Sequence, residues 1–373
     1  MNVKEAVLDC YSEGARAVQP SLCCPVNYDQ DLLKLIPQEI IDKDYGCGDP
    51  SRYVQEGDTV LDLGSGGGKI CYMAAQKVGP NGKVIGVDMN DDMLALARKY
   101  QPEMAQKLGS DRVEFHKGHI QDLALSIDAM EDYLAKHPVK TAADLDALLH
   151  WQDQFRKQTP MIADNSIDLV VSNCVLNLVS DREKQQLINE LYRVLKPGGR
   201  VAVSDIVSDE VSPDHLKRDP ELWSGCISGA FQEKAFLDAF AEAGFLCVQY
   251  DAWDNEPWQV IEGIEFRSVT LTAIKGETSP CLDIGQAVIY KGPYAQVLDD
   301  EGHIFPRGER MAVCERTFRF LTEGPLKEDF IGIQPAQPAE PRTFCMPAGT
   351  VRPASETKGG SHHGGGKRSG GCC

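Results

Sequence analysis

Apolar residues in the middle of the chain form short, nearly continuous runs, separated by longer segments with helical spacing. The runs occupy residues 59–63, 84–88, 113–115, 167–172 and 200–204. Between them, apolar side chains recur three or four positions apart over residues 69–78, over 91–100, and at Leu187, Leu191, Val194 and Leu195. Because strands buried on both faces are apolar throughout, this alternation predicts an α/β fold with a parallel sheet and helices on both faces.

The alternation is preceded by a different pattern and is interrupted once. Residues 1–50 are mixed helix and loop, with a short apolar helical stretch interrupted or started at Pro37. Residues 51–275 form the predicted main domain. Within it, residues 124–165 carry two acidic segments of helical spacing, which we interpret as a surface helical hairpin between the third and fourth strands. The insertion is either decorative or a lid or partner surface.

After the main domain the pattern changes again. Residues 276–334 contain short strand-like runs at 286–290, 295–298 and 317–320, which predict a small β-rich domain. Residues 335–373 are rich in proline and glycine and end in GGSHHGGGKRSGGCC. Such a segment buries too little apolar surface to order itself, so it is predicted to be a flexible tail.

Composition and charge exclude several classes of function. Hydrophobic residues make up 42% of the 373 positions, and 38 basic against 56 acidic side chains give a net charge of −18. Since nucleic-acid affinity depends on Lys and Arg, we expect no nucleic-acid partner. No apolar run approaches the ~18 residues of a membrane span, so we expect no membrane partner. Glu5, Asp9 and Glu13 argue against an export signal, and we expect a monomer in the cytoplasm.

The thirteen cysteines are the unusual feature of the composition. In a reducing compartment disulfides are rare, and thiols serve as metal ligands or catalysts. The absence of any CxxC pair argues against a zinc ribbon or a thioredoxin-like site. Cys71 lies inside a predicted helix and is assigned to the core. No function is assigned to Cys10, Cys247, Cys281, Cys314 and Cys345.

A glycine-rich loop, residues 62–68, joins the first predicted strand to the first helix. A dinucleotide fingerprint would need Gly at position 69, where Lys69 stands. A phosphate-binding P-loop would need Gly at 63 and Ser or Thr at 70, where Leu63 and Ile70 stand. The D-x-G-x-G-x-G pattern fits S-adenosylmethionine-dependent methyltransferases of the Rossmann-like class, although a plain glycine-rich turn is the alternative.

The surroundings of the loop favour the methyltransferase interpretation. Asp88 ends the second strand 20 residues after Gly68, where an acid can accept hydrogen bonds from ribose hydroxyls, although a helix or turn cap is the alternative. Residues 118–122 follow the third strand, where the adenine edge would lie. The predicted cofactor-binding residues are Asp62, Gly64, Ser65, Gly66, Gly68, Asp88, Met89, Ile120, Gln121 and Asn173.

Three cysteine segments carry a resemblance to a known family. Cys174 directly follows the fourth predicted strand, at the edge where α/β sheets bind ligands. The segments 44–48 (DYGCG), 172–177 (SNCVLN) and 225–230 (GCISGA) together resemble the arsenite S-adenosylmethionine methyltransferases. The resemblance covers about residues 44–334, and it implies a Rossmann-like class I methyltransferase sheet with a small C-terminal domain.

The resemblance also implies a function and a set of site residues. Cys174 and Cys226 match the pair that binds trivalent arsenic, and Cys47 matches a third cysteine that joins them or forms a transient disulfide. A further N-terminal cysteine would be Cys23 or Cys24. The implied reaction is methylation of arsenite and methylarsenite in arsenic detoxification, with thioredoxin or glutathione as thiol reductant. On the predicted tail, Cys372 and Cys373 are either an arsenic-capturing pair or solvated residues.

The chemistry suits these residue types. Soft thiolates select soft centres such as trivalent arsenic, whose lone pair carries no proton and therefore needs no general base. This agrees with the absence of an evident His–Asp pair or metal cluster at the predicted strand ends. Two alternatives stay open. One is a methyltransferase for another acceptor, such as another arsenical, a soft element or a small metabolite, and the other is a thiol protein that only binds metalloids.

Overall fold

A computed structural model describes residues 3–17, 26–335 and 339–357. The chain divides into two compact units, residues 1–276 and 277–373, which are described separately. No helix in the described ranges is both long and apolar enough to cross a bilayer.

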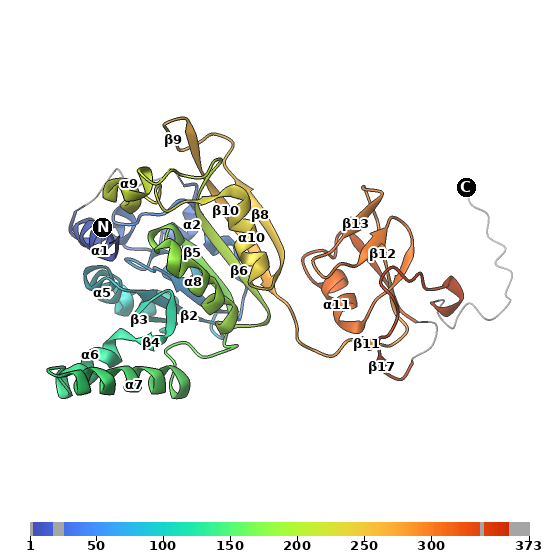
Figure 1. Cartoon of the computed structure of the whole chain (residues 1–373), viewed down its shortest axis with the longest axis horizontal. Helices are drawn as coiled ribbons and strands as arrows, with labels where there is room; N and C mark the ends of the chain where they lie inside the picture. Colours follow the sequence, from blue (N-terminus) through green and yellow to red (C-terminus); the bar gives the residue numbers. More distant parts are fainter. Residues whose placement is uncertain (1–2, 18–25, 336–338, 358–373) are drawn as a thin grey trace. The chain divides into compact units, whose positions relative to one another are not determined.

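The larger unit is built on one ten-stranded sheet in the order β4-β3-β2-β1-β5-β6-β10-β8, with β7 beside β6 and β9 beside β10 (Figure 1). Its strands are β1 (Thr59–Leu63), β2 (Lys83–Asp88), β3 (Val113–His119), β4 (Asp122–Ser126), β5 (Ile167–Asn173), β6 (Leu195–Ser208), β7 (Phe231–Gln232), β8 (Phe245–Trp253), β9 (Gln259–Ile261) and β10 (Ile264–Lys275). Strands β3, β2, β1, β5 and β6 run parallel, so their carboxyl ends meet at one edge. The predicted α/β fold with a Rossmann-like parallel sheet is confirmed.

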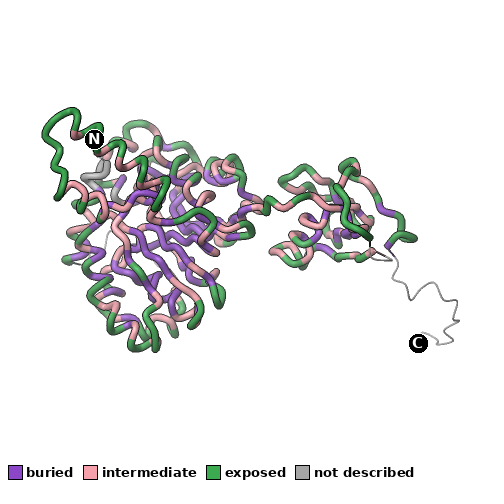
Figure 2. Tube along the Cα trace, turned by 90° about the horizontal axis from the view of Figure 1, so that it is seen from below, coloured by how far each residue is buried: buried purple, intermediate pink, exposed green. Residues whose placement is uncertain are grey.

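Helices pack on both faces of this sheet because alternate strand residues point to opposite sides. Val60 packs in a cluster with Ile70 of α4 (Lys69–Lys77) and Leu94 of α5 (Asp91–Leu108). The adjacent Leu61 packs in a second cluster with Leu187 of α8 (Asp181–Val194) and with α10 (Glu233–Glu242). The strands are accordingly the most continuously buried part of the unit (Figure 2).

Short elements precede β1 or follow β5 and β6 in the chain. They are α1 (Val3–Arg16), α2 (Gln30–Leu33), α3 (Gln38–Asp42), and the 3-10 turns η2 (Pro50–Tyr53), η3 (Leu176–Leu178) and η4 (Leu216–Arg218), with α9 (Pro220–Ser224). Helix α1 packs against α5, α9 and η3. Helix α1 therefore lies at the edge where the candidate residues lie.

The insertion contains a helical hairpin preceded by a strand that the sequence did not predict. After β4 come α6 (Ile127–Lys136) and α7 (Ala142–Gln158), which are held together by stacking of Tyr133 on Trp151, with ring centroids 4.6 Å apart. Helix α7 has no buried residue, so the hairpin projects from the β4 edge (Figure 1).

The smaller unit is a three-stranded sheet, two strand pairs and one helix. Its elements are β11 (Leu282–Asp283), β12 (Ala287–Tyr290), β13 (Gln296–Leu298), β14 (Ile304–Pro306), β15 (Arg310–Ala312), α11 (Glu315–Glu323), β16 (Phe330–Ile333), β17 (Arg342–Thr343) and the turn η5 (Ala354–Glu356). The prediction of a strand at residues 317–320 is wrong, because these residues lie in α11. Its buried residues are Thr317, Phe318 and Leu321, and Phe318 and Leu321 belong to the apolar cluster of the unit.

The expectation of a flexible tail from residue 335 is wrong for residues 339–357. Within this range β17 pairs with β11, and the Arg352 guanidinium donates to the Asp283 carboxylate at 2.9 Å. Arg352 is 4% exposed and Asp283 2% exposed. A buried ion pair orders this proline-rich stretch, whereas the sequence argument considered only apolar burial.

Replacement of Arg352 tests whether this stretch belongs to the fold. Arg352→Ala should remove the buried partner of the Asp283 charge, leave only the exposed Arg342 beside it, and destabilise the smaller unit by up to about 3–5 kcal/mol. Arg342 donates to the same carboxylate at 3.1 Å, but its side chain is 71% exposed. The matched variant Arg342→Ala should lose only about 0–1 kcal/mol. Hydrogen exchange at the β12 amides measures both, and equal effects of the two variants would contradict the assignment.

Candidate active site

The conformation of the glycine loop between β1 and α4 is fixed by contacts with the neighbouring strands β2 and β3. Asp88, at the end of β2, accepts hydrogen bonds from the backbone amides of Gly66 and Asn90, both at 2.8 Å. Burial raises the pKa of the Asp88 carboxyl, and these amides partly offset the effect. Gly68 begins α4 with φ of +88°, and a Cβ there would lie 2.9 Å from the Phe115 ring. Glycine therefore fits where a larger residue would distort the loop.

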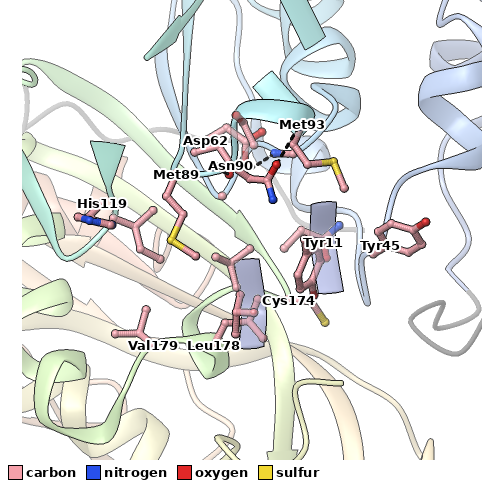
Figure 3. Close-up of a pocket in the computed structure, with 18 of the residues that line it drawn as sticks. Tyr11, Tyr45, Asp62, Met89, Asn90, Met93, His119, Cys174, Leu178 and Val179 are labelled. Atoms are coloured by element: carbon pink, nitrogen blue, oxygen red, sulfur yellow. Dashed lines mark hydrogen bonds between the residues drawn. The ribbon is translucent and has the colours of Figure 1, made fainter. Parts of the chain in front are cut away.

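A cavity opens beside this loop (Figure 3). The predicted cofactor residues that line it are Asp62, Gly64, Ser65, Gly66, Asp88, Met89, Ile120, Gln121 and Asn173. Gly68 does not line it. The sequence did not predict the contribution of α1, which adds Tyr11 to the wall, or of Tyr45, Met93 and Leu178.

The polar groups in the cavity wall fit a cationic ligand that carries hydroxyls. The Ser65 hydroxyl is buried and has no hydrogen-bond partner within the described part of the chain. Burial raises the pKa of Asp62 to about 7, although the Cys71 thiol donates to its carboxylate at 3.1 Å. An unsatisfied buried hydroxyl and two buried carboxyls are groups that a bound sulfonium nucleoside would satisfy.

Three of the predicted thiols meet at the carboxyl end of β5. Cys47, Cys174 and Cys226 belong to one buried apolar cluster with Ile206 and Phe266. Cys47 and Cys174 form a disulfide with Cα atoms 5.8 Å apart. The Cys226 thiol donates to the Cys174 carbonyl oxygen at 3.1 Å. Cys174 also lines the cavity, so one residue belongs to both the thiol cluster and the cavity wall (Figure 3).

Both Cys174 and Cys226 have left-handed backbone conformations, with φ of +58° and +63°. Side-chain-bearing residues rarely adopt this region, and such strain clusters at functional sites. The other predicted thiols, Cys23, Cys24, Cys372 and Cys373, lie outside the described residues. Cys71 is buried inside α4 as expected.

The Asn173 side chain holds the Cys47 segment against the end of β5. Its carbonyl oxygen accepts from the amides of Cys47 at 2.9 Å and Gly48 at 3.0 Å, and its amide donates to the Gly48 carbonyl at 2.9 Å. A Cβ on Gly46 would lie 2.1 Å from the Asn173 amide nitrogen. The sequence placed Asn173 only at the cofactor, whereas the structure shows that it also positions Cys47.

Two groups beside the thiols were missed by the sequence analysis. The sulfurs of Cys47 and Cys174 and an Asp205 carboxylate oxygen all lie within 4.8 Å of one another. Asp205 is 1% exposed, and its burial raises its pKa to about 7. The expectation of no such group near Cys174 is therefore wrong, because β6 continues to Ser208 and brings Asp205 beside β5. On the other side, the Tyr11 hydroxyl of α1 hydrogen-bonds the Cys226 sulfur.

Only the Ser204-Asp205 pair could have signalled Asp205, because it follows a predicted strand. The sequence offered no signal for Tyr11. It lies more than 200 positions from Cys226, on a helix whose placement depends on tertiary contacts.

Comparisons with known proteins identify the family of this chain. A family model described as a methyltransferase domain matches residues 54–150 and 148–244, and a domain of unknown function matches residues 277–362. An arsenite methyltransferase of Aquipseudomonas alcaligenes is 32% identical over 82% of this chain and 83% of the relative. One of Mus musculus is 29% identical over 89% of this chain and 80% of the relative.

A solved structure is also similar. It is an arsenic(III) S-adenosylmethionine methyltransferase from Chlamydomonas reinhardtii, 27% identical, with a TM-score of 0.53 over 88% of this chain and 100% of that chain. This chain belongs to the arsenite methyltransferase family.

Proposed function

We propose that this chain methylates trivalent arsenic that is bound by the thiolates of Cys174, Cys226 and Cys47. The observation that carries the proposal is the position of Cys174, which lines the cavity with the glycine loop and also belongs to the thiol cluster. A nucleophile bound to this sulfur faces the space in which a methyl donor would lie. Membership of the arsenite methyltransferase family supports the same substrate.

S-adenosylmethionine, when bound, supplies an electrophilic methyl group on a sulfonium. The residues that would hold it are the loop glycines, Ser65, Asp62 and Asp88. The buried carboxyls suit a cation, and Asp88 at the end of β2 suits ribose hydroxyls. Ile120 and Gln121, which follow β3, would border the adenine.

Arsenite binding requires free thiols, so the Cys47–Cys174 disulfide must first be reduced. A thiol reductant such as thioredoxin or glutathione would supply two electrons and two protons. Three As–S bonds can then replace the three As–OH groups of arsenous acid, and the thiol protons leave with the hydroxyls as three water molecules. Asp205 is close enough to the Cys47 and Cys174 sulfurs to relay a thiol proton to a departing hydroxyl during this exchange.

The structure supports the proposal through the positions of the thiols. Arsenic held by three sulfurs keeps its lone pair, and methyl transfer then depends on placing that lone pair in line with the methyl group. Asn173 fixes Cys47, and Asn177 donates to the Cys226 carbonyl at 3.3 Å. The apolar cluster around the sulfurs limits competing water. In this proposal the enzyme is a cytoplasmic monomer that detoxifies arsenic.

The alternatives explain fewer observations. A ubiquinone/menaquinone biosynthesis C-methyltransferase of Klebsiella pneumoniae is 27% identical over 43% of this chain. A carbon, oxygen or nitrogen acceptor would leave the buried thiol cluster at the end of β5 without a role in the reaction. A protein that only binds metalloids would have no use for the glycine loop and its cavity.

Removal of either proposed arsenic ligand tests the reaction. Cys174→Ser and Cys226→Ser should each abolish arsenite methylation, because serine lacks the soft thiolate but fits the same space. Arsenic speciation after incubation with S-adenosylmethionine, glutathione and arsenite measures turnover. Cys345→Ser, at an exposed cysteine of the smaller unit, is the control and should retain turnover. Full turnover in either ligand variant would refute the assignment.

The proposed donor site is tested at Asp88. Asp88→Ala should weaken S-adenosylmethionine binding by about 1–3 kcal/mol, because ribose hydroxyls would lose an acceptor. Calorimetric titration measures the affinity. Asp91→Ala removes a nearby, largely exposed carboxylate and should bind like the parent. If Asp88→Ala and the parent bind equally well, Asp88 does not contact the donor.

The positioning role of Asn173 is tested by two variants, one that removes both its side-chain carbonyl and its NH2 group and one that removes only the NH2 group. Asn173→Ala leaves two backbone amides unpaired and should destabilise the Cys47 segment by about 1–3 kcal/mol. Asn173→Asp keeps the acceptor and should lose less. Hydrogen exchange at the Cys47 and Gly48 amides reports the difference. Parent-like exchange in Asn173→Ala would show that other contacts hold the segment.

A further inference from the structure

The smaller unit brings together two cysteines that are 33 positions apart in the sequence. Cys281 directly precedes β11, and Cys314 directly precedes α11, which contacts β11 (Figure 1). The buried Gln286 amide joins the two segments, since it donates to the carbonyls of Val313 at 2.8 Å and Leu282 at 3.4 Å. The side chains of Cys281 and Cys314 hydrogen-bond each other.

The two thiols differ in environment. Cys314 is 5% exposed and caps α11, where its sulfur accepts from the Thr317 amide at 3.5 Å and lies 3.3 Å from the Thr317 hydroxyl. Burial opposes ionisation of Cys314, but the hydrogen bonds from Thr317 and Cys281 outweigh it and lower its pKa. Cys281 is half-buried, so the pair is accessible from its side.

Further groups border the pair. The turn between β13 and β14 brings Asp299, Glu301 and His303 within 4.8 Å of one another. The main cause of the raised pKa of His303 is the hydrogen bond that its ring donates to the Asp299 carboxylate, and Cys314 adds a smaller contribution. Arg316 favours the thiolate forms of both cysteines. A preformed thiol pair with one thiol primed for ionisation is a site for a soft electrophile that accepts two sulfurs.

We propose that Cys281 and Cys314 form a second arsenical site, which binds singly methylated trivalent arsenic. The choice of ligand follows from valence. Arsenous acid has three exchangeable hydroxyls, whereas methylarsonous acid has two, matching the two sulfurs of the pair. On binding, two As–O bonds break and two As–S bonds form, and both thiol protons leave with the hydroxyls as two water molecules. No electrons are transferred. The identity of the ligand rests on the proposed methylation. There the arsenic lone pair becomes the As–C bond, and two electrons from thiols, which pair as a disulfide, return the arsenic to the trivalent state.

The test is the arsenic content of the full-length chain. Reduced protein is incubated with methylarsonous acid and glutathione, desalted, and analysed by elemental mass spectrometry. Cys281→Ser and Cys314→Ser should each lose one equivalent of arsenic per chain. The double variant Cys281→Ser/Cys314→Ser should lose no more than either single variant, because one arsenic needs both sulfurs. Cys345→Ser should retain the arsenic content of the parent.

Serine is tolerated at both test positions. Residue 314 is the N-cap of α11, where serine is a preferred residue, and residue 281 is half-buried, so its hydroxyl can be solvated. A second measurement needs no variant. Methylarsonous acid should slow alkylation of Cys281 by N-ethylmaleimide about tenfold or more, since bound arsenic removes the thiolate, and should leave the exposed Cys345 unaffected. Unchanged arsenic content in both single variants, additive losses, or unprotected Cys281 would overturn the proposal.

The same preparations are assayed for arsenite methylation, so that the two proposals can fail separately. If the parent does not methylate arsenite but the losses at Cys281 and Cys314 appear, the proposed function fails and the second site stands. If the parent methylates arsenite and those losses do not appear, the second site fails and the proposed function stands.

Discussion

The hydrogen bonds between the Asn173 side chain and the backbone of Cys47 and Gly48 are the contact on which the site depends. Asn173 is the last residue of β5, a central parallel strand whose position is fixed by pairing with β1 and β6. The next residue is Cys174. One strand end therefore orients one thiol through the chain and a second through the Asn173 amide. The disulfide between Cys47 and Cys174 follows from this placement.

Two buried carboxyl groups, those of Asp62 and Asp205, lie at the same carboxyl edge of the sheet. Burial raises the pKa values of Asp62 and Asp205 to about 7 in both cases. Each carboxyl therefore holds a proton more tightly in the folded chain. Its contribution to stability is present below its ordinary pKa near 3.8 and is lost as pH rises through about 7. At neutral pH these groups destabilise the fold, which is understandable if a cationic donor and the thiol chemistry make use of them.

The smaller unit is organised by polar contacts as much as by its apolar cluster. Asp283 accepts from Arg352 and Arg342, and Gln286 links the segments that carry Cys281 and Cys314. These buried groups are satisfied by partners far away in the sequence. A buried polar group that finds its partner stabilises one arrangement, because alternative arrangements leave it unpaired. The thiol pair is therefore held by the same network that orders the proline-rich residues after β16.

The sequence by itself determined the parallel sheet, the glycine loop and the three cysteine segments, because each depends on residues that are neighbours in the chain. Apolar runs define buried strands, and glycines define a tight turn before a helix. Tertiary structure decided the rest. Asp205 lies beside the thiols because β6 extends beside β5. Tyr11 contacts Cys226 because α1 packs on α9 and η3. Residues 317–320 form a helix although their short pattern resembles a strand. The order of residues 339–357 and the meeting of Cys281 with Cys314 depend on long-range pairs, which local patterns of hydrophobicity do not encode.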